Sequence, residues 1–197
     1  MTFSILSLNI KLLNRFEKII FQLGVIILFL GFHTLTYALD TAKEYEIKAV
    51  YLLNLGNFIK WTPDSLQSEK TFQICVVGHD PFGADLDFVV QTQKEVQGYQ
   101  VVIKRLSSSA PLTACRILFM SNSEQLHWSN IFAKVKHKPV LTVGDGDNFV
   151  IEGGMIQFYN KDGKIRLMLD PQTIRESGLK ASAQLMQLAL RIEHKGK

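Results

Sequence analysis

The sequence predicts an α/β fold: a single domain with a mostly parallel sheet flanked by helices and an antiparallel hairpin toward the C-terminus. Short β-branched and apolar runs alternate with segments of helical periodicity, which is typical of parallel strands connected by helices. The 197 residues are 47% hydrophobic and 20% charged. This is enough for one domain with a sizeable core, and it excludes a disordered chain.

The first 38 residues have the pattern of a secretory signal peptide. An almost unbroken apolar run at residues 19–32 follows three basic residues and precedes small residues that suit cleavage after Ala38. We therefore expect an exported protein whose mature domain is residues 39–197. An uncleaved membrane anchor is the alternative, although the run is shorter than the about 20 residues of a spanning helix. Without the leader the formal net charge falls from +4 to +2, so we expect no nucleic-acid partner.

Residues 43–59 are predicted to form the first helix of the mature domain, because apolar residues recur there at helical spacing. Trp61 and Pro63 end it, since proline disfavours helical backbone at the preceding residue. Two interpretations of Trp61 stay open. It is either a core side chain that closes the helix end, or an anchor on a partner surface together with Phe58 and Ile59, because tryptophan is over-represented at binding hot spots.

A strand, a turn and a helix are expected next. Residues 71–77 are apolar and β-branched, and Asp80 with Pro81 predicts the N-cap and first position of a helix over residues 83–91. The turn lacks a G-x-G-x-x-G motif and a Walker lysine, which argues against a nucleotide site. If the protein binds a small molecule, we expect the pocket at the carboxyl ends of the strands, near His79, Asp80 and Ser121.

The middle of the chain continues the alternation of strands and helices. Strands are predicted at residues 100–106, 116–120 and 139–143, with a helix from residue 122 to about residue 135 between the last two. His127 lies on this helix without a second histidine or a carboxylate at i+4, so we expect no metal ion there.

The C-terminal part predicts the hairpin and two helices. Residues 155–159 and 164–169 flank the turn signal Asn160-Lys161-Asp162-Gly163. Asp170 and Pro171 predict the start of a short helix that ends at residue 177, before a left-handed Gly178. A longer helix is expected over residues 180–193.

No arrangement of residues predicts catalysis. The chain has no G-x-S-x-G and no C-x-x-C motif. Asp145 and Asp147 lie in a glycine-rich turn, where aspartate is common for backbone reasons, and Glu152 reads as an exposed turn residue. We therefore expect a non-catalytic protein without a cofactor or a metal ion.

The two cysteines, Cys75 and Cys115, are an even number in a protein expected to be exported, which favours a disulfide. Such a bridge would close a loop of about 40 residues and stabilise the fold by roughly 4 kcal/mol on the chain-entropy model. A pair of buried free thiols is the alternative.

Two parts of the sequence resemble the YfiR-like family of small periplasmic proteins. One is YEIKAVYLLNLGNFIKWTP at residues 45–63, and the other is the ordered set LTVGD, GGMIQF, IRLMLD and GLKASAQLMQLA. The resemblance covers roughly residues 44–192 and supports the disulfide, because members of the family have a cysteine pair at corresponding positions. Some relatives have a second pair near the Gly-Gly segment. This chain has none there, so behaviour that depends on that bridge is not expected.

The resemblance also implies a function. YfiR-like proteins repress a membrane-bound diguanylate cyclase by binding its periplasmic sensory part, and an outer-membrane partner such as a lipoprotein, or a redox change, releases them. This chain would then tune cyclic-di-GMP signalling and biofilm formation, as a monomer or a homodimer. The alternative is a periplasmic small-molecule binding module of a transport or sensing system.

Overall fold

The computed structural model describes residues 42–61 and 70–193. The fold below is that of the unit of residues 44–197, together with residues 42 and 43 at the start of its first helix. The predicted leader and its cleavage after Ala38 lie outside the described residues. No helix in the described ranges is long and apolar enough to cross a membrane.

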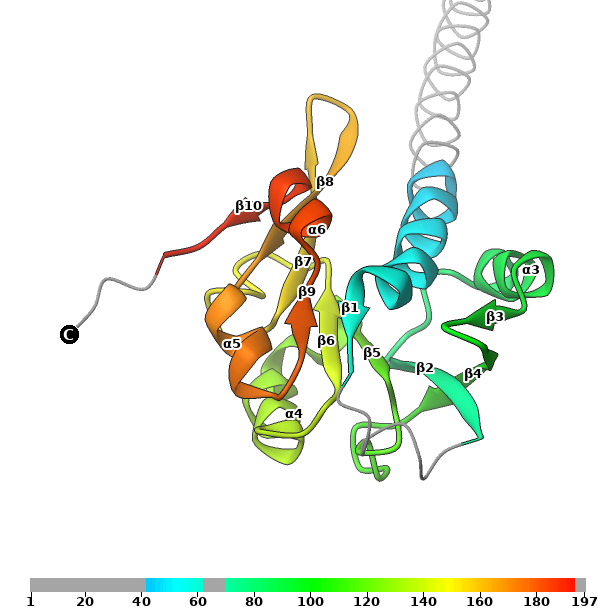
Figure 1. The fold of residues 1–197 in the computed structure, drawn as a ribbon, viewed down its shortest axis with the longest axis horizontal. Helices are drawn as coiled ribbons and strands as arrows, with labels where there is room; N and C mark the ends of the chain where they lie inside the picture. Colours follow the sequence, from blue (N-terminus) through cyan, green and yellow to red (C-terminus); the bar gives the residue numbers. More distant parts are fainter. Residues whose placement is uncertain (1–41, 62–69, 194–197) are drawn as a thin grey trace, which may run out of the picture. The chain divides into compact units, whose positions relative to one another are not determined.

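The elements alternate between helices and strands along most of the chain (Figure 1). A helix over residues 42–58 comes first and is called the 42–58 helix. After it come β1 (Ile59–Lys60), β2 (Thr71–Val77), α3 (Ala84–Thr92), β3 (Glu95–Val96), β4 (Tyr99–Leu106), β5 (Ile117–Met120), the 3₁₀ helix η1 (Asn122–His127), α4 (Trp128–Val135), β6 (Leu141–Gly144), β7 (Ile156–Lys161), β8 (Lys164–Leu169), α5 (Pro171–Glu176), β9 (Lys180–Ala181), α6 (Ala183–Leu188) and β10 (Leu190–Arg191).

In the described part of the chain the main sheet has eight strands, in the order β10-β8-β7-β6-β5-β2-β4-β3. The neighbouring strands β4, β2, β5, β6 and β7 pair in parallel, while β7 and β8 form an antiparallel hairpin. A second, two-stranded sheet joins β1 to β9. The predicted α/β class, the mostly parallel sheet and the C-terminal hairpin are confirmed.

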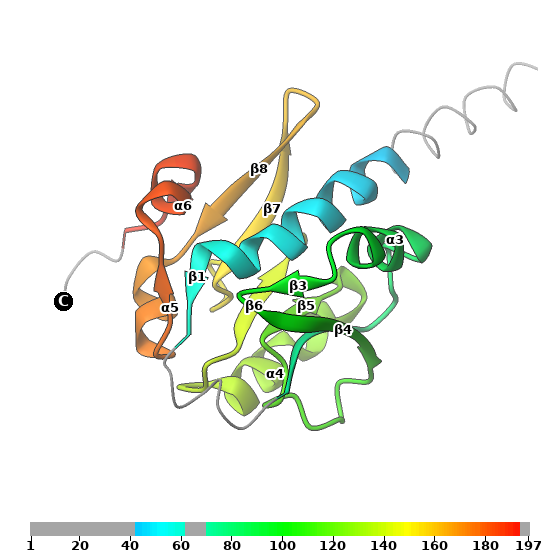
Figure 2. The same ribbon diagram turned by 45° about the vertical axis from the view of Figure 1, so that its right-hand side comes forward.

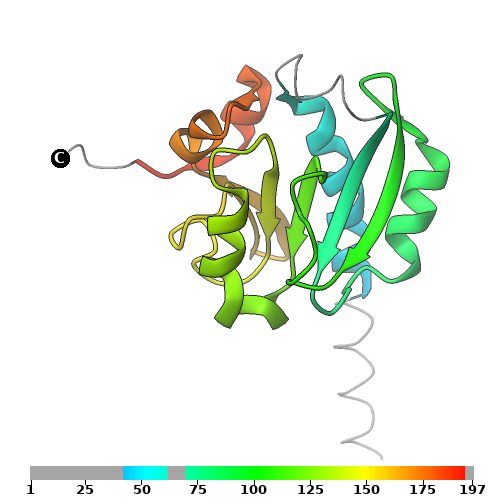
Figure 3. The same ribbon diagram turned by 90° about the horizontal axis from the view of Figure 1, so that it is seen from below.

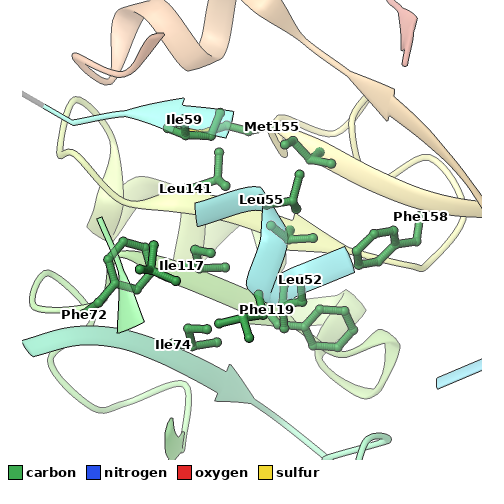
Figure 4. Packing of buried hydrophobic residues seen from close by; sticks show 14 of the residues in the cluster. Leu52, Leu55, Ile59, Phe72, Ile74, Ile117, Phe119, Leu141, Met155 and Phe158 are labelled. Atoms are coloured by element: carbon green, nitrogen blue, oxygen red, sulfur yellow. The ribbon is translucent and has the colours of Figure 1, made fainter. Parts of the chain in front are cut away.

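Both faces of the sheet are covered over its central strands β2, β5 and β6, as the apolar runs in these strands require. Alternate residues of β5 face opposite sides, so Ile117 and Phe119 belong to one core and Leu118 to the other. The first core lies under the 42–58 helix and includes residues of α3, α5 and α6 (Figure 2). Figure 4 shows Leu52 and Leu55 of the 42–58 helix among side chains of the sheet. The second core lies under α4 (Figure 3).

The glycines of the LTVGD and GGMIQF motifs make room for one aromatic ring. Phe149 is fully buried, and a Cβ atom at Gly144 or at Gly154 would overlap its ring. Trp128 and Phe132 of α4 pack edge-on against the same ring, with centroid distances of 4.9 and 5.4 Å. The motif therefore encodes a packing site for Phe149 at the base of the loop between β6 and β7.

Three predicted helices differ from the structure. The helix predicted over residues 180–193 is wrong: Lys180 and Ala181 pair with β1, and Ser182 caps the short α6 by accepting a hydrogen bond from the Leu185 N–H at 3.2 Å. The helix predicted from residue 122 begins as the 3₁₀ helix η1. The 42–58 helix ends one residue early, because Ile59 enters β1.

Asp80 is not a helix N-cap. Its Oδ1 accepts a hydrogen bond from the Phe82 N–H at 2.8 Å, which closes a turn before the helix, and α3 begins after Gly83. The prediction for Asp170 and Pro171 is confirmed, since Asp170 accepts hydrogen bonds from two N–H groups at the start of α5 and Pro171 is its first residue. Gly178 has the predicted left-handed conformation, with φ 74°.

Candidate functional site

An apolar groove lies between the 42–58 helix, β8 and α6, and is called the hairpin groove. Its volume is about 220 Å³. The 42–58 helix contributes Tyr51, Asn54, Leu55 and Phe58, β8 contributes residues 165–167, and α6 contributes Leu185 and Leu188. Figures 1 and 2 show the 42–58 helix and α6 on either side of the β7–β8 hairpin, which extends beyond the rest of the sheet.

The groove exists because the 42–58 helix is apolar on more of its circumference than the core can cover. Leu52, Leu53 and Leu55 are buried, yet Val50 is 40% and Tyr51 39% exposed. A helix with apolar residues on both its inner and outer faces is typical of an element that is covered by a partner. Leu188 continues the exposed apolar surface onto α6 and is 67% exposed.

Basic side chains border this surface at the hairpin. Lys161, Lys164 and Arg166 are exposed and form no ion pair with any acid in the described part of the chain. Strand β10 pairs only with the last two residues of β8. Among the described strands, residues 164–167 therefore have a neighbour on the β7 side alone.

The predicted partner surface of Phe58, Ile59 and Trp61 is corrected by the structure. Only Phe58, which is half-buried, lines the hairpin groove. Ile59 is fully buried (Figure 4), and Trp61 is 5% exposed. The Trp61 Nε1–H donates a hydrogen bond to the Pro139 carbonyl at 3.0 Å, and its ring packs on Phe72 with a centroid distance of 5.2 Å. The core interpretation of Trp61 is the right one, because the residue closes the end of the helix against the sheet.

The residues of the alternative small-molecule site lie at the carboxyl ends of β2 and β5, as predicted. Their polar groups, however, already bind neighbouring residues of the protein. Asp80 Oδ2 pairs with the Arg105 Nε at 2.7 Å. Ser121 is buried beside Ser123, whose hydroxyl accepts a hydrogen bond from the His79 N–H at 2.9 Å. The Arg105 guanidinium also binds Asp87, and these hydrogen bonds raise its pKa.

A buried charge cluster joins the 42–58 helix to the end of β6, and sequence reasoning missed it. The Lys48 ammonium pairs with Asp145 at 2.7 Å and with Glu44 at 2.6 Å, and the Lys48 and Asp145 side chains are only 4% and 5% exposed. The Tyr45 hydroxyl donates to the same Asp145 carboxylate at 2.8 Å. Burial, followed by the charge of Asp145, raises the pKa of Tyr45. The i,i+4 spacing of Glu44 and Lys48 is the one sequence signal for this cluster.

The disulfide between Cys75 and Cys115 is present, in agreement with the prediction. It joins β2 to the residues just before β5, and both cysteines are fully buried. Within the described ranges no group of three or more histidine, cysteine or acidic residues is arranged to hold a metal ion.

The comparisons with known proteins give a family and a distant structural likeness. A family model described as YfiR/HmsC-like matches residues 45–190. No curated protein matches the sequence. One similar solved structure is a conserved domain protein from Vibrio cholerae, with 10% sequence identity and a TM-score of 0.46. The match covers 65% of this chain and 56% of that one, so the chain spans little more than half the length of that relative.

Proposed function

The chain belongs to the YfiR/HmsC-like family, and from this premise we propose that it is a non-catalytic periplasmic regulator of a membrane diguanylate cyclase. It binds the periplasmic sensory part of the cyclase and represses it, and so lowers cyclic-di-GMP and biofilm formation. A second partner, of the outer-membrane lipoprotein type, or a redox change releases it.

The observation that carries this proposal is the hairpin groove. Regulation by protein contact needs an accessible apolar surface with a polar border, because apolar burial supplies affinity and the charged rim supplies specificity. Tyr51 and Leu188 are the large exposed apolar side chains of the groove, and the basic Lys164 and Arg166 at its hairpin side favour an acidic partner. We propose that the sensory part of the cyclase docks here.

Two further observations support the periplasmic assignment. The Cys75–Cys115 disulfide fits an oxidising compartment. The sequence pattern before residue 39 fits export, with cleavage after Ala38 as the prediction.

The test compares two charge-introducing variants with a matched control in the native host. Leu188→Glu and Tyr51→Glu place a carboxylate in the groove, whereas Leu126→Glu places one at a residue that is 91% exposed on η1. Tagged protein is captured from detergent-solubilised membranes and cyclic-di-GMP is measured in the same strains. We expect the wild type and Leu126→Glu to retain a membrane diguanylate cyclase and keep cyclic-di-GMP low, and the two groove variants to lose both effects.

The possible outcomes test the docking surface and the regulatory function separately. If the groove variants still hold the cyclase, the docking surface is wrong and the regulatory role stands. If no cyclase is captured by the wild type, and deletion of the protein leaves cyclic-di-GMP unchanged, the proposed function is wrong.

A further inference from the structure

A second cavity lies between α4, residues 152–155 and α5. Its volume is about 390 Å³, within the range of small-molecule sites. It is called the α4–α5 cavity. It shares no residue with the hairpin groove, where the cyclase is proposed to bind.

The cavity has an apolar wall that Gly153 leaves open. Gly153 has a φ of +116°, and a Cβ atom there would lie 3.5 Å from Phe132 Cδ2. With glycine at this position no side chain covers the ring of Phe132, which lines the cavity. The ring of Phe149 packs against the ring of Phe132. Met155, which is 3% exposed and packs in the first core (Figure 4), also lines the cavity.

Two buried hydroxyl groups line the same cavity. Thr142 is 1% exposed, and it points away from the core that contains its neighbours Leu141 and Val143. Its Oγ1 accepts a hydrogen bond from the Met155 N–H at 3.0 Å, so its own proton and one lone pair stay available. Ser177 is 5% exposed, and its hydroxyl forms no hydrogen bond with the described residues. A ligand would supply the missing partners.

The remaining polar groups are mostly acceptors. The His137 Nδ1 lies 3.3 Å from the Glu176 carbonyl oxygen, which can only accept, so Nδ1 carries the proton and Nε2 of the neutral ring is an acceptor. The lining residues include the acids Glu152 and Glu176 against one lysine, Lys136, and in the described part of the chain neither acid is ion-paired. The cavity thus carries a net negative charge.

We propose that the α4–α5 cavity binds a small organic ammonium ion, a primary amine with a compact apolar or aromatic body. The apolar body packs on Phe132 and Met155, where a ring also gains an aromatic contact. The ammonium N–H groups donate to the Ser177 hydroxyl and the carboxylates, and the negative lining favours the cation over neutral and anionic analogues.

The test is a methyl NMR titration of the protein purified after expression of the full chain with ¹³C-methyl methionine. Met155 lines the cavity, whereas Met186 on α6 does not and serves as the internal reference. The Met155→Leu variant identifies the Met155 signal. Three probes share one body: 2-phenylethylammonium, the neutral 2-phenylethanol and the anionic phenylacetate. We expect the ammonium probe to shift the Met155 methyl signal saturably while the Met186 signal stays in place.

Paired variants test the charge argument without disturbing the core. Glu152→Gln with Glu176→Gln should weaken binding of the ammonium probe about fivefold. Glu95→Gln with Glu193→Gln, two exposed acids outside the cavity, should leave it unchanged. The proposal is overturned if the Met155 signal does not move at about 10 mM probe. It is also overturned if 2-phenylethanol or phenylacetate binds as tightly as the ammonium.

Discussion

Lys48 and Asp145 form an ion pair with both side chains buried, although they lie 97 residues apart in the sequence. The pair fixes the N-terminal half of the 42–58 helix to the carboxyl end of β6. Tyr45 adds a hydrogen bond from one side and places its ring 4.3 Å from the ammonium. The position of the helix, and with it the helix side of the hairpin groove, therefore depends on a polar contact as well as on the core.

Removing Asp145 should destabilise the fold. Asp145→Ala leaves the buried Lys48 ammonium with Glu44 alone, and breaking one partner from a buried pair costs about 3 kcal/mol. Urea denaturation followed by circular dichroism measures this loss. Asp147→Ala, at an exposed position two residues away, is the control and should change the unfolding free energy little.

A double variant shows whether charge is the cause. Lys48→Met with Asp145→Leu removes both charges and should recover most of the loss, because apolar pairs replace buried ion pairs at little cost. If the double variant is as unstable as Asp145→Ala, the desolvated ammonium is not the reason for the loss.

The hydroxyl of Tyr45 should make stability fall in alkaline solution. The pKa of Tyr45 is raised on folding, mainly by burial, so the tyrosine ionises in the unfolded chain first and stability is lost as pH rises above about 10. Below this pH the contribution is fully present. We expect the urea midpoint of the wild type to drop more between pH 8 and pH 11 than that of Tyr45→Phe.

Tyr51→Phe is the control for this comparison, because it removes a hydroxyl from an exposed position of the same helix. Equal slopes for the wild type and Tyr45→Phe would contradict the assignment to Tyr45.

The disulfide should stabilise the fold by an amount that grows with the logarithm of the length of the loop it closes. Cys75 and Cys115 are 40 residues apart, which corresponds to about 4 kcal/mol on the chain-entropy model. Cys75→Ala with Cys115→Ala should lower the melting temperature by up to roughly 10 °C. Reductant should lower the melting temperature of the wild type and leave that of the double variant unchanged. This account would be contradicted if thiol titration showed the wild type to be fully reduced and its melting temperature had nevertheless not changed.

Replacing Trp61 should lower the stability of the fold, and any loss of partner binding should follow from that loss of stability. Trp61→Ala removes a ring packed on Phe72 and an N–H bonded to Pro139, which costs about 3 kcal/mol or more. Thermal unfolding measures the change. Trp61→Phe keeps most of the packing and should lose clearly less. If Trp61→Ala folds as stably as the wild type yet binds no cyclase, the surface interpretation of Trp61 would return.

Local signals in the sequence predicted much of the fold. The β-branched runs placed β2, β4, β5 and β6 to within one or two residues. For β2, β5 and β6 the reason is that strands covered on both faces are nearly continuous in apolar residues. Asp170, Pro171 and Gly178 marked the ends of α5, since capping and left-handed backbone depend on a few adjacent residues.

Contacts between distant segments explain what the sequence could not predict. Residues 180–193 have helical periodicity, but pairing of Lys180 and Ala181 with β1 takes them out of the helix. Asp145 was interpreted as an ordinary turn residue, because its partner Lys48 lies 97 residues earlier in the sequence. The groove is likewise formed by three separate elements, and the cavity by residues of α4, β6, α5 and the segment before β7, so no single stretch of sequence contains them.

The short pairing of β10 with β8 has a consequence for the behaviour of the protein in concentrated solution. Residues 164–167 present an open strand edge, the kind of edge along which identical chains stack into aggregates. Exposed Lys164 and Arg166 put two like charges on it, so a second copy that approaches edge to edge meets the same charges and is repelled. These two charges thus oppose edge-to-edge association at β8, and their effect should weaken as added salt screens them.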